Sequence, residues 1–136
     1  MNTEINYQVG FVPALEHIIA LYAAAGLKRP IDDKQRMMKM FANSNLLITA
    51  WQGEHLIGIA RSMNDGGFCC YLADLAVHPS YQKRGIGRQL IHLTKATAGD
   101  DCSLIWLSAP GAISYYHKIG IQQLKNAFGI DRLHPI

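Results

Sequence analysis

A basic turn with two glycines, Gln82–Arg88, lies between a predicted strand and a predicted helix. Gly85 and Gly87 allow the backbone to turn sharply and to approach a ligand without clashes from Cβ atoms. The first N–H groups of the following helix have no partner within that helix, and they point out of its positive end. Further positive charge comes from Lys83, Arg84 and Arg88. The turn is therefore predicted to hold a phosphate-bearing ligand.

The glycine pair does not match either of two familiar phosphate loops. The dinucleotide-binding pattern G-x-G-x-x-G needs a further glycine where this chain has Leu90. The P-loop pattern G-x-x-x-x-G-K-[ST] does not occur. Two interpretations of the turn alone therefore stay open, a phosphate cradle of another kind and an ordinary helix start with a basic surface.

Apolar periodicity along the chain predicts a mixed α+β fold with the element order β-α-α-β-β-β-α-β-α-β. The predicted strands are Ile5–Val9, Leu46–Trp51, His55–Met63, Phe68–Val77, Ser103–Leu107 and Gln122–Phe128. The predicted helices follow Pro13 up to Gly26, follow a cap at Asp32 or Asp33 up to Ala42, and cover Gly85–Ala98 and Ala112–Ile119. A crossover helix requires the strands it joins to be parallel, so we expect a mixed, mostly antiparallel sheet with helices on both faces.

The composition is that of a globular domain. A length of 136 residues predicts one domain, 1–136, and 49% hydrophobic against 17% charged residues excludes a disordered chain. A net charge of +3 is too small to suggest nucleic-acid binding. The longest apolar stretch, Ile18–Leu27, is too short to span a bilayer, and the first residues carry no export signal, so we expect neither a membrane anchor nor secretion.

The cysteines and histidines predict a reducing compartment and no metal. Cys69, Cys70 and Cys102 are odd in number and two of them are adjacent, which argues against a disulfide framework and favours the cytoplasm. None of them stands in a C-x-x-C, and the six histidines lack ligand spacing. We therefore expect no structural metal.

Two motifs resemble those of one enzyme family. The run Leu75–Leu90, LAVHPSYQKRGIGRQL, strongly resembles the acetyl-CoA signature of the GNAT superfamily of N-acetyltransferases, in which an L-x-V-type strand end precedes [QR]-x-x-G-x-[GA]. Near the other end, Tyr115–Ile121, YYHKIGI, is similar to the family's [FY]-Y-x-K-x-G-F. The order and spacing of the predicted elements also resemble that fold over essentially the whole chain.

The resemblance implies an N-acetyltransferase that moves an acetyl group from acetyl-CoA directly to a primary amine of a small molecule in a ternary complex. Backbone amides of the matched turn would hold the CoA pyrophosphate, here those of Gln82, Lys83, Arg84, Gly85, Ile86, Gly87 and Arg88. The strand end before it would pair with the pantetheine arm through Leu75, Ala76 and Val77. Two alternatives stay open, a non-catalytic acyl-CoA-binding sensor or interaction module, and acetylation of a protein amine.

The resemblance also implies a proton donor but leaves the base open. Tyr116 occupies the family's tyrosine position, and its phenol, protonated at neutral pH, would donate to the leaving CoA sulfur. Some members carry a glutamate base where this chain has Tyr71. Asp74 could act as the base through a water, whereas the alternative is a structural pair with Arg61. The predicted hairpin register places Arg61 opposite Leu72, on the same face of the strand as Asp74.

The acceptor and the oligomeric state are less constrained. In the family, the acceptor pocket is shaped by the first two helices and the C-terminal strands, which here span residues 22–41 and 121–132. The mixed charge of both stretches names no ligand. Two departures from the family pattern put cofactor contacts in doubt, because Ala109 replaces a frequent Asn and Ile121 replaces the usual Phe. Many members pair near the C-terminus, so we expect a homodimer.

Overall fold

A computed structural model describes residues 4–136, which divide into two compact units. The larger unit runs up to Trp106, and the smaller is Leu107–Ile136. The larger unit contains the predicted phosphate turn, and the smaller contains the predicted donor tyrosine.

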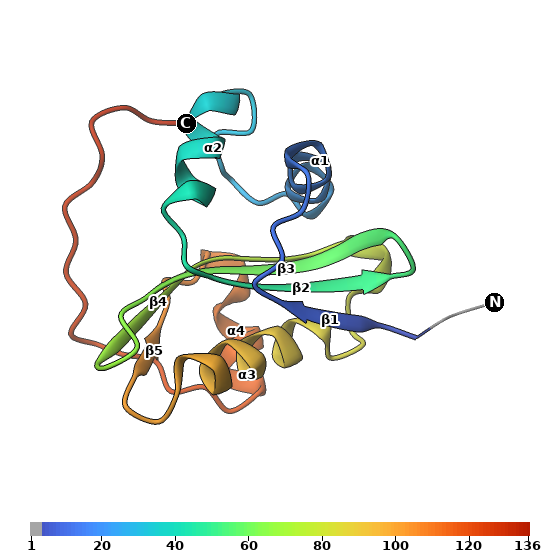
Figure 1. Cartoon of the computed structure of the whole chain (residues 1–136). Coiled ribbons are helices and arrows are strands. Elements are labelled where there is room, and N and C mark those ends of the chain that lie inside the picture. The colour runs from blue at the N-terminus through green and yellow to red at the C-terminus, as the bar shows by residue number, and fades with distance from the viewer. Residues whose placement is uncertain (1–3) are drawn as a thin grey trace. The chain divides into compact units, whose positions relative to one another are not determined.

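The larger unit is built on one five-stranded sheet in the order β1-β2-β3-β4-β5 (Figure 1). The strands are β1 Asn6–Val9, β2 Leu46–Gln52, β3 His55–Asn64, β4 Cys69–Val77 and β5 Ser103–Ile105. The pairs β1–β2, β2–β3 and β3–β4 are antiparallel, and the pair β4–β5 is parallel. The predicted α+β class with a mixed, mostly antiparallel sheet is therefore confirmed. The last of these strands is shorter than the predicted Ser103–Leu107.

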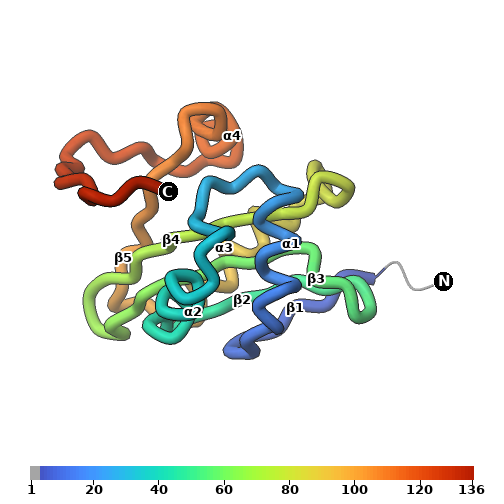
Figure 2. The backbone as a smooth tube through the Cα atoms, turned by 90° about the horizontal axis from the view of Figure 1, so that it is seen from above, coloured from blue at the N-terminus to red at the C-terminus, as the bar shows by residue number. Residues whose placement is uncertain are grey.

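Helices cover both faces of this sheet (Figures 1 and 2). On one face lie α1, Leu15–Ala25, and α2, Lys34–Ala42, and on the other lies α3, Ile86–Ala98. The helix ends follow their sequence signals. Gly26 adopts the left-handed conformation after α1, and the Asp33 side chain accepts a hydrogen bond from the Arg36 N–H, which makes it the N-cap of α2.

The main core lies between the sheet and the helices α1 and α2. Apolar side chains from both helices pack on the sheet there, namely Ile18, Leu21, Tyr22, Met37, Phe41, Leu47, Trp51, Leu56, Ile59 and Ala76. On the opposite face, Gly58 of β3 lets α3 approach closely. A Cβ atom at Gly58 would lie 3.1 Å from Leu90 Cδ1 and 3.3 Å from Ile86 Cγ2. The start of α3 is thereby held against the centre of the sheet.

A β-bulge interrupts the pairing of β3 with β4. Arg61 pairs with Asp74, but the next residue, Ser62, pairs with Leu72, so Ala73 is the extra residue. The predicted register, with Arg61 opposite Leu72, is wrong for that reason. Because paired residues share a face and neighbours alternate, Leu72 and Asp74 lie on opposite faces of the sheet although they are two positions apart.

The smaller unit contains a short 3₁₀ turn, Pro110–Ala112, and the helix α4, Ile113–Lys118. The strand predicted over Gln122–Phe128 is wrong, because the described chain has no regular element after α4. An extended segment is stabilised by a paired neighbour, and the described sheet contains only the five strands of the larger unit. Apolar side chains of this tail are solvent-exposed, with Phe128 at 99% and Ile130 at 101%.

Candidate functional site

The predicted phosphate turn connects β4 to α3 by two tight steps. After β4, residues Pro79–Tyr81 form a 3₁₀ turn that is capped by the His78 ring, whose Nδ1 accepts from the Ser80 N–H at 3.1 Å. The backbone then passes through φ values of 64° at Lys83 and 78° at Gly85 before α3 begins. Glycine adopts this left-handed conformation without strain, whereas a residue with a Cβ atom does not.

The N-terminus of α3 presents free backbone donors. The first bond into the helix runs from the Gln89 N–H to the Gly85 carbonyl at 3.0 Å, and Gly85 supplies no side-chain cap. The N–H groups of Ile86, Gly87 and Arg88 therefore have no acceptor within the helix. These donors and the helix dipole together favour an anionic group such as a pyrophosphate.

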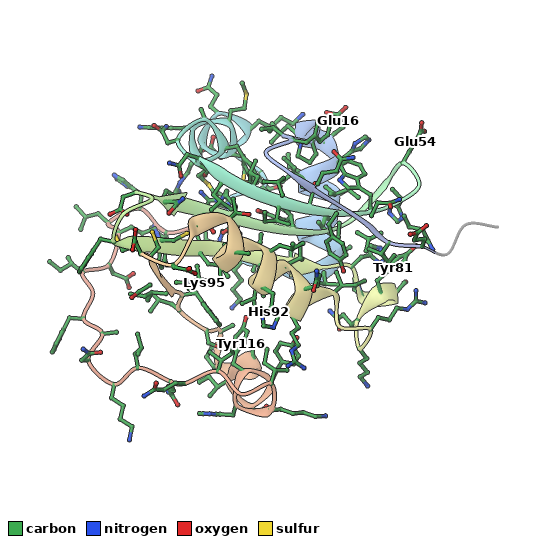
Figure 3. The ribbon with its side chains drawn as sticks, turned by 60° about the horizontal axis from the view of Figure 1, so that its bottom comes forward. Glu16, Glu54, Tyr81, His92, Lys95 and Tyr116 are labelled. Carbon is green, nitrogen blue, oxygen red and sulfur yellow. The ribbon has the colours of Figure 1, made fainter. Side chains whose placement is uncertain are left out.

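Aromatic side chains anchor the turn to the β2–β3 hairpin. The Tyr81 hydroxyl hydrogen-bonds the Gln52 side chain, and the rings of His55, His78 and Tyr81 pack edge to face. The Arg84 guanidinium lies 5.2 Å from the centre of the Tyr81 ring. Figure 3 labels Tyr81 in the segment that precedes α3 in the chain. No sequence signal indicated this role of Tyr81, because Gln52 and His55 are distant from it in the chain.

The strand before the turn has an open edge. The pairing of β4 with β5 ends at Tyr71↔Ile105, while β4 continues to Val77. On its other side β4 remains paired with β3 as far as Val77↔Gly58. Leu75, Ala76 and Val77 therefore lie on a stretch of β4 that has no described strand on its β5 side. An extended ligand arm can pair with backbone groups at such an edge.

Asp74 lies in a buried network on the α1 and α2 face. Its Oδ2 accepts hydrogen bonds from the Tyr22 hydroxyl at 2.7 Å and from Arg61 Nε at 2.6 Å, and its Oδ1 accepts from Arg29 Nε at 2.5 Å. The Asp74 side chain has no exposed surface. Arg29, from the α1–α2 loop, also donates to the Ala73 carbonyl at 2.7 Å.

The network holds Asp74 ionised. Burial alone would raise the pKa of Asp74, but the hydrogen bond and the charge of Arg61 outweigh it and leave the pKa below its ordinary value. Burial, and then the Asp74 charge, raise the pKa of Tyr22 well above its ordinary value, so its phenol stays a donor. The Arg61–Asp74 pair that the sequence analysis gave as the structural alternative is present. A role for Asp74 as a base stays a prediction. No sequence signal indicated the part of Arg29, which lies 45 positions before Asp74 in the chain.

Tyr71 and the residues of the second motif lie at the start of β4 and in the smaller unit. Tyr71 is exposed on β4, at the last position that β5 pairs. Tyr116 lies on α4, half-buried, with its ring 5.4 Å from that of Tyr115 in an edge-to-face arrangement. His117 Nε2 lies 3.0 Å from Gln123 Oε1.

Residues 4–136 contain neither a metal-binding cluster nor a membrane-spanning helix. Nowhere in that range do three or more His, Cys, Asp or Glu side chains gather closely enough to hold a metal ion. Nor does that range contain a helix with the length and apolar character needed to cross a bilayer.

Comparison with known proteins agrees with the geometry. The model of the acetyltransferase (GNAT) family matches residues 14–121, and the chain belongs to this family. It is 33% identical over 100 residues to the "Uncharacterized N-acetyltransferase ycf52" of Pyropia yezoensis, covering 69% of this chain and 56% of that protein. A ycf52-like protein of Prochlorococcus marinus is 30% identical over 119 residues, covering 83% and 64%. The chain thus spans somewhat more than half the length of these relatives.

Solved structures share the fold at low sequence identity. A probable acetyltransferase from meticillin-resistant Staphylococcus aureus aligns with a TM-score of 0.78 at 22% identity, covering 96% of this chain and all of that one. An aminoglycoside N-acetyltransferase solved in complex with CoA aligns with a TM-score of 0.72 at 16% identity, covering 96% of each chain. These likenesses support the GNAT-like fold.

Proposed function

We propose that this protein is an acetyl-CoA-dependent N-acetyltransferase that acts on a primary amine of a small molecule. The observation that carries the proposal is the open N-terminus of α3, which follows a left-handed glycine turn directly after an unpaired strand edge. Together these offer an anion cradle and a backbone ladder to one ligand with a pyrophosphate and an amide-containing arm. The family membership supports acetyl-CoA as that ligand.

The proposed cofactor contacts are mainly backbone groups. Amides from Gln82 to Arg88 hold the pyrophosphate, with Lys83, Arg84 and Arg88 adding positive charge nearby. Backbone groups of Leu75, Ala76 and Val77 pair with the pantetheine arm. This binding mode does not require the side chains of the turn to reach the pantetheine arm.

In the proposed reaction, the amine nitrogen attacks the thioester carbonyl carbon and forms a tetrahedral oxyanion. The nitrogen of this intermediate loses one proton to water, the oxyanion collapses to an amide as the C–S bond breaks, and the sulfur leaves with the bonding electron pair. Tyr116 is the proposed donor of a proton to that sulfur, because its position in the YYHKIGI motif is the family's donor position. The ammonium proton of the substrate must leave before the attack.

The base is less well supported than the proton donor Tyr116. Tyr71 stands where some family members carry a glutamate, and the Asp74 oxygens accept three hydrogen bonds from Tyr22, Arg29 and Arg61. Asp74 acting through a water remains the candidate, and a neutral amine taken directly from solution is the alternative. The structural neighbour described above is an aminoglycoside N-acetyltransferase, which supports a small-molecule acceptor.

The first test is calorimetric titration of the purified protein with acetyl-CoA, CoA and NAD, followed by mass spectrometry of acetylated products across an amine panel. Selective binding of acetyl-CoA and CoA with product from any amine supports the proposal. Selective binding without any product favours a sensor, and product on protein lysines alone favours protein acetylation. No binding of acetyl-CoA contradicts the proposal.

A further inference from the structure

The Asp74 network contains more positive than negative charge. Two guanidinium groups, those of Arg29 and Arg61, share the single carboxylate of Asp74. Arg61 is almost fully buried and also donates to the Ser44 hydroxyl. Arg61 and Asp74 neutralise each other, so the charge of Arg29 is the surplus. Within residues 4–136, Asp74 is the ion-pair partner recorded for Arg29.

Arg29 keeps hydrogen-bonding capacity. A guanidinium group carries about five N–H donors in a planar fork. The bonds of Arg29 run from Nε to Asp74, from one terminal nitrogen to the Lys28 carbonyl and from the other to the Ala73 carbonyl. One N–H on each terminal nitrogen is left, and the side chain is 30% exposed. A partly buried surplus cation with spare donors is suited to a carboxylate.

The location of Arg29 relates it to the proposed reaction. It donates hydrogen bonds to Ala73 and Asp74 of β4, directly before Leu75. The proposed contacts to the pantetheine arm begin at Leu75. A strand advances by about 3.3 Å per residue, so the guanidinium lies within a few residues' length of the arm. Arg29 belongs to the loop between α1 and α2, and these helices lie on the face of the sheet opposite to α3 (Figure 1).

A row of apolar side chains lies on that face of the sheet. Met63, Tyr71 and Ile105 pair in register across β3, β4 and β5, so they share one face of the sheet, and all three are exposed. Met63 Sδ lies 3.8 Å from the Arg61 guanidinium, which places this row on the same face as the Asp74 network. None of the three offers the acidic group that a polycationic acceptor requires.

We propose that Arg29 binds a carboxylate of the acceptor, so that the acceptor is an amino acid-like amine with an apolar remainder rather than a polyamine. This inference rests on the proposed function, because it identifies the acceptor of the same site. The carboxylate pairs with the free edge of the Arg29 fork, and the apolar remainder lies against the row of Met63, Tyr71 and Ile105.

The test compares acceptors that differ only in the carboxylate. L-phenylalanine is compared with its amide and with phenethylamine, and 6-aminohexanoate with 6-aminohexanamide, with spermidine as the polycation. Acetylated product is quantified by mass spectrometry. We expect kcat/KM for the better carboxylate to exceed that of its amide by about 10-fold or more, the range of a charge-assisted hydrogen bond.

Variants assign the preference to Arg29. Arg29→Gln should bring the carboxylate-to-amide ratio close to one, and Arg29→Lys should restore part of it, because a lysine keeps the charge but not the fork. Lys95→Gln, which removes a positive charge from α3, should keep the wild-type ratio. Each ratio is measured within one protein sample, so a partial loss of folded protein does not affect it.

A binding experiment tests the inference even if none of these amines is acetylated. The CoA-loaded protein is titrated with 3-phenylpropanoate and with 3-phenylpropanamide, and tighter binding of the carboxylate that is lost in Arg29→Gln supports the inference. Equal binding of both, a preference for the amide or spermidine, or an unchanged ratio in Arg29→Gln overturns it. Failure of acetyl-CoA itself to bind overturns the proposed function as well, so the two failures are distinguishable.

Discussion

At the scale of single residues, the Asp74 carboxylate joins four segments of the chain. It receives donors from α1, from the α1–α2 loop and from β3, and it belongs to β4. Part of this arrangement could be predicted from the sequence. A cap at Asp33 and a pair between Arg61 and Asp74 were both predictable from local spacing or hairpin geometry. Arg29 and Tyr22 were not, because only the folded backbone brings distant positions together.

Removing the Asp74 charge should destabilise the protein strongly. In Asp74→Asn, Arg61 stays buried without a carboxylate partner, and such a change costs about 3–5 kcal/mol. Chemical denaturation monitored by circular dichroism measures the free energy of unfolding. Asp100→Asn, at an exposed position, is the control and should change it by less than about 0.5 kcal/mol. An Asp74→Asn protein as stable as the wild type would contradict the structural role of the network.

The same carboxylate predicts a pH dependence of stability. The pKa of Asp74 is lowered in the folded protein, so its stabilisation is fully present above the unfolded pKa of about 3.9 and is lost as pH falls through the lower folded value. The wild type should therefore lose stability below about pH 4 more steeply than Asp74→Asn does. Unfolding free energies of both proteins, measured from pH 7 down to pH 3, supply the comparison. Parallel curves would show that Asp74 is not held ionised by its partners.

Tyr116 provides the residue-scale test of the proposed chemistry. Tyr116→Phe removes the phenolic proton and should lower kcat about 100-fold, the lower range for a general acid, while the Kd of acetyl-CoA stays within a factor of about two. Stopped assays of product and calorimetric titration separate the two quantities. Tyr115→Phe is the matched control and should retain the rate. An unaltered kcat in Tyr116→Phe would remove this tyrosine from the mechanism.

At the scale of elements, periodicity predicted most of the larger unit. The helices and the five strands of this unit lie within a few residues of their predicted bounds, because apolar alternation and the Gly and Pro signals act locally. The bulge at Ala73 and the absence of a strand over Gln122–Phe128 could not be predicted in this way. Both depend on what a segment pairs with, and alternation within one segment carries no information about its partner.

The glycine turn before α3 should tolerate only residues that accept its backbone conformation. Gly85 has open space around its Cα but a φ of 78°, so Gly85→Val is strained by the backbone alone. We expect Gly85→Val to weaken acetyl-CoA binding by at least about 10-fold, because the amides of the turn no longer converge. Gly85→Asn should bind better than Gly85→Val, since Asn enters the left-handed region more readily. Calorimetric Kd values that are equal for the two variants would contradict this explanation.

The contact between α3 and the sheet should be sensitive to volume at Gly58. Its Cβ position lies 3.2 Å from Ala50 Cβ as well as close to Ile86 and Leu90, so Gly58→Val overpacks this interface. We expect a loss of about 1–3 kcal/mol in stability and weaker acetyl-CoA binding, because Ile86 opens the helix that holds the cradle. Gly67→Ala, in open space, is the control for both measurements. Full stability of Gly58→Val would mean that α3 lies further from the sheet.

At the scale of the whole molecule, the exposed apolar tail supports the expected homodimer. Phe128, Ile130 and Leu133 expose more than nine-tenths of their surface, and a second copy of the chain would remove this apolar surface from water. We predict that the wild type is a dimer by light scattering coupled to size-exclusion chromatography, and that a chain ending at Ile121 is a monomer. The triple variant Phe128→Ser, Ile130→Ser and Leu133→Ser should behave like the shortened chain. A monomeric wild type would contradict this prediction.

The extra residue in β4 has a consequence for how this sequence can change over time. Cys70, Leu72, Asp74 and Ala76 are all buried, an even alternation that would ordinarily mean one buried face. Because Ala73 is inserted between them, the first two face the α3 side and the last two face α1 and α2. Deletion of a paired residue between Ala73 and the end of the strand would exchange the two sides for everything beyond it, whereas deletion of Ala73 itself would leave the pairs Arg61↔Asp74 and Ser62↔Leu72 consecutive. Descendants of this chain can therefore replace the exposed residues of β4 more freely than they can alter the length of its paired parts.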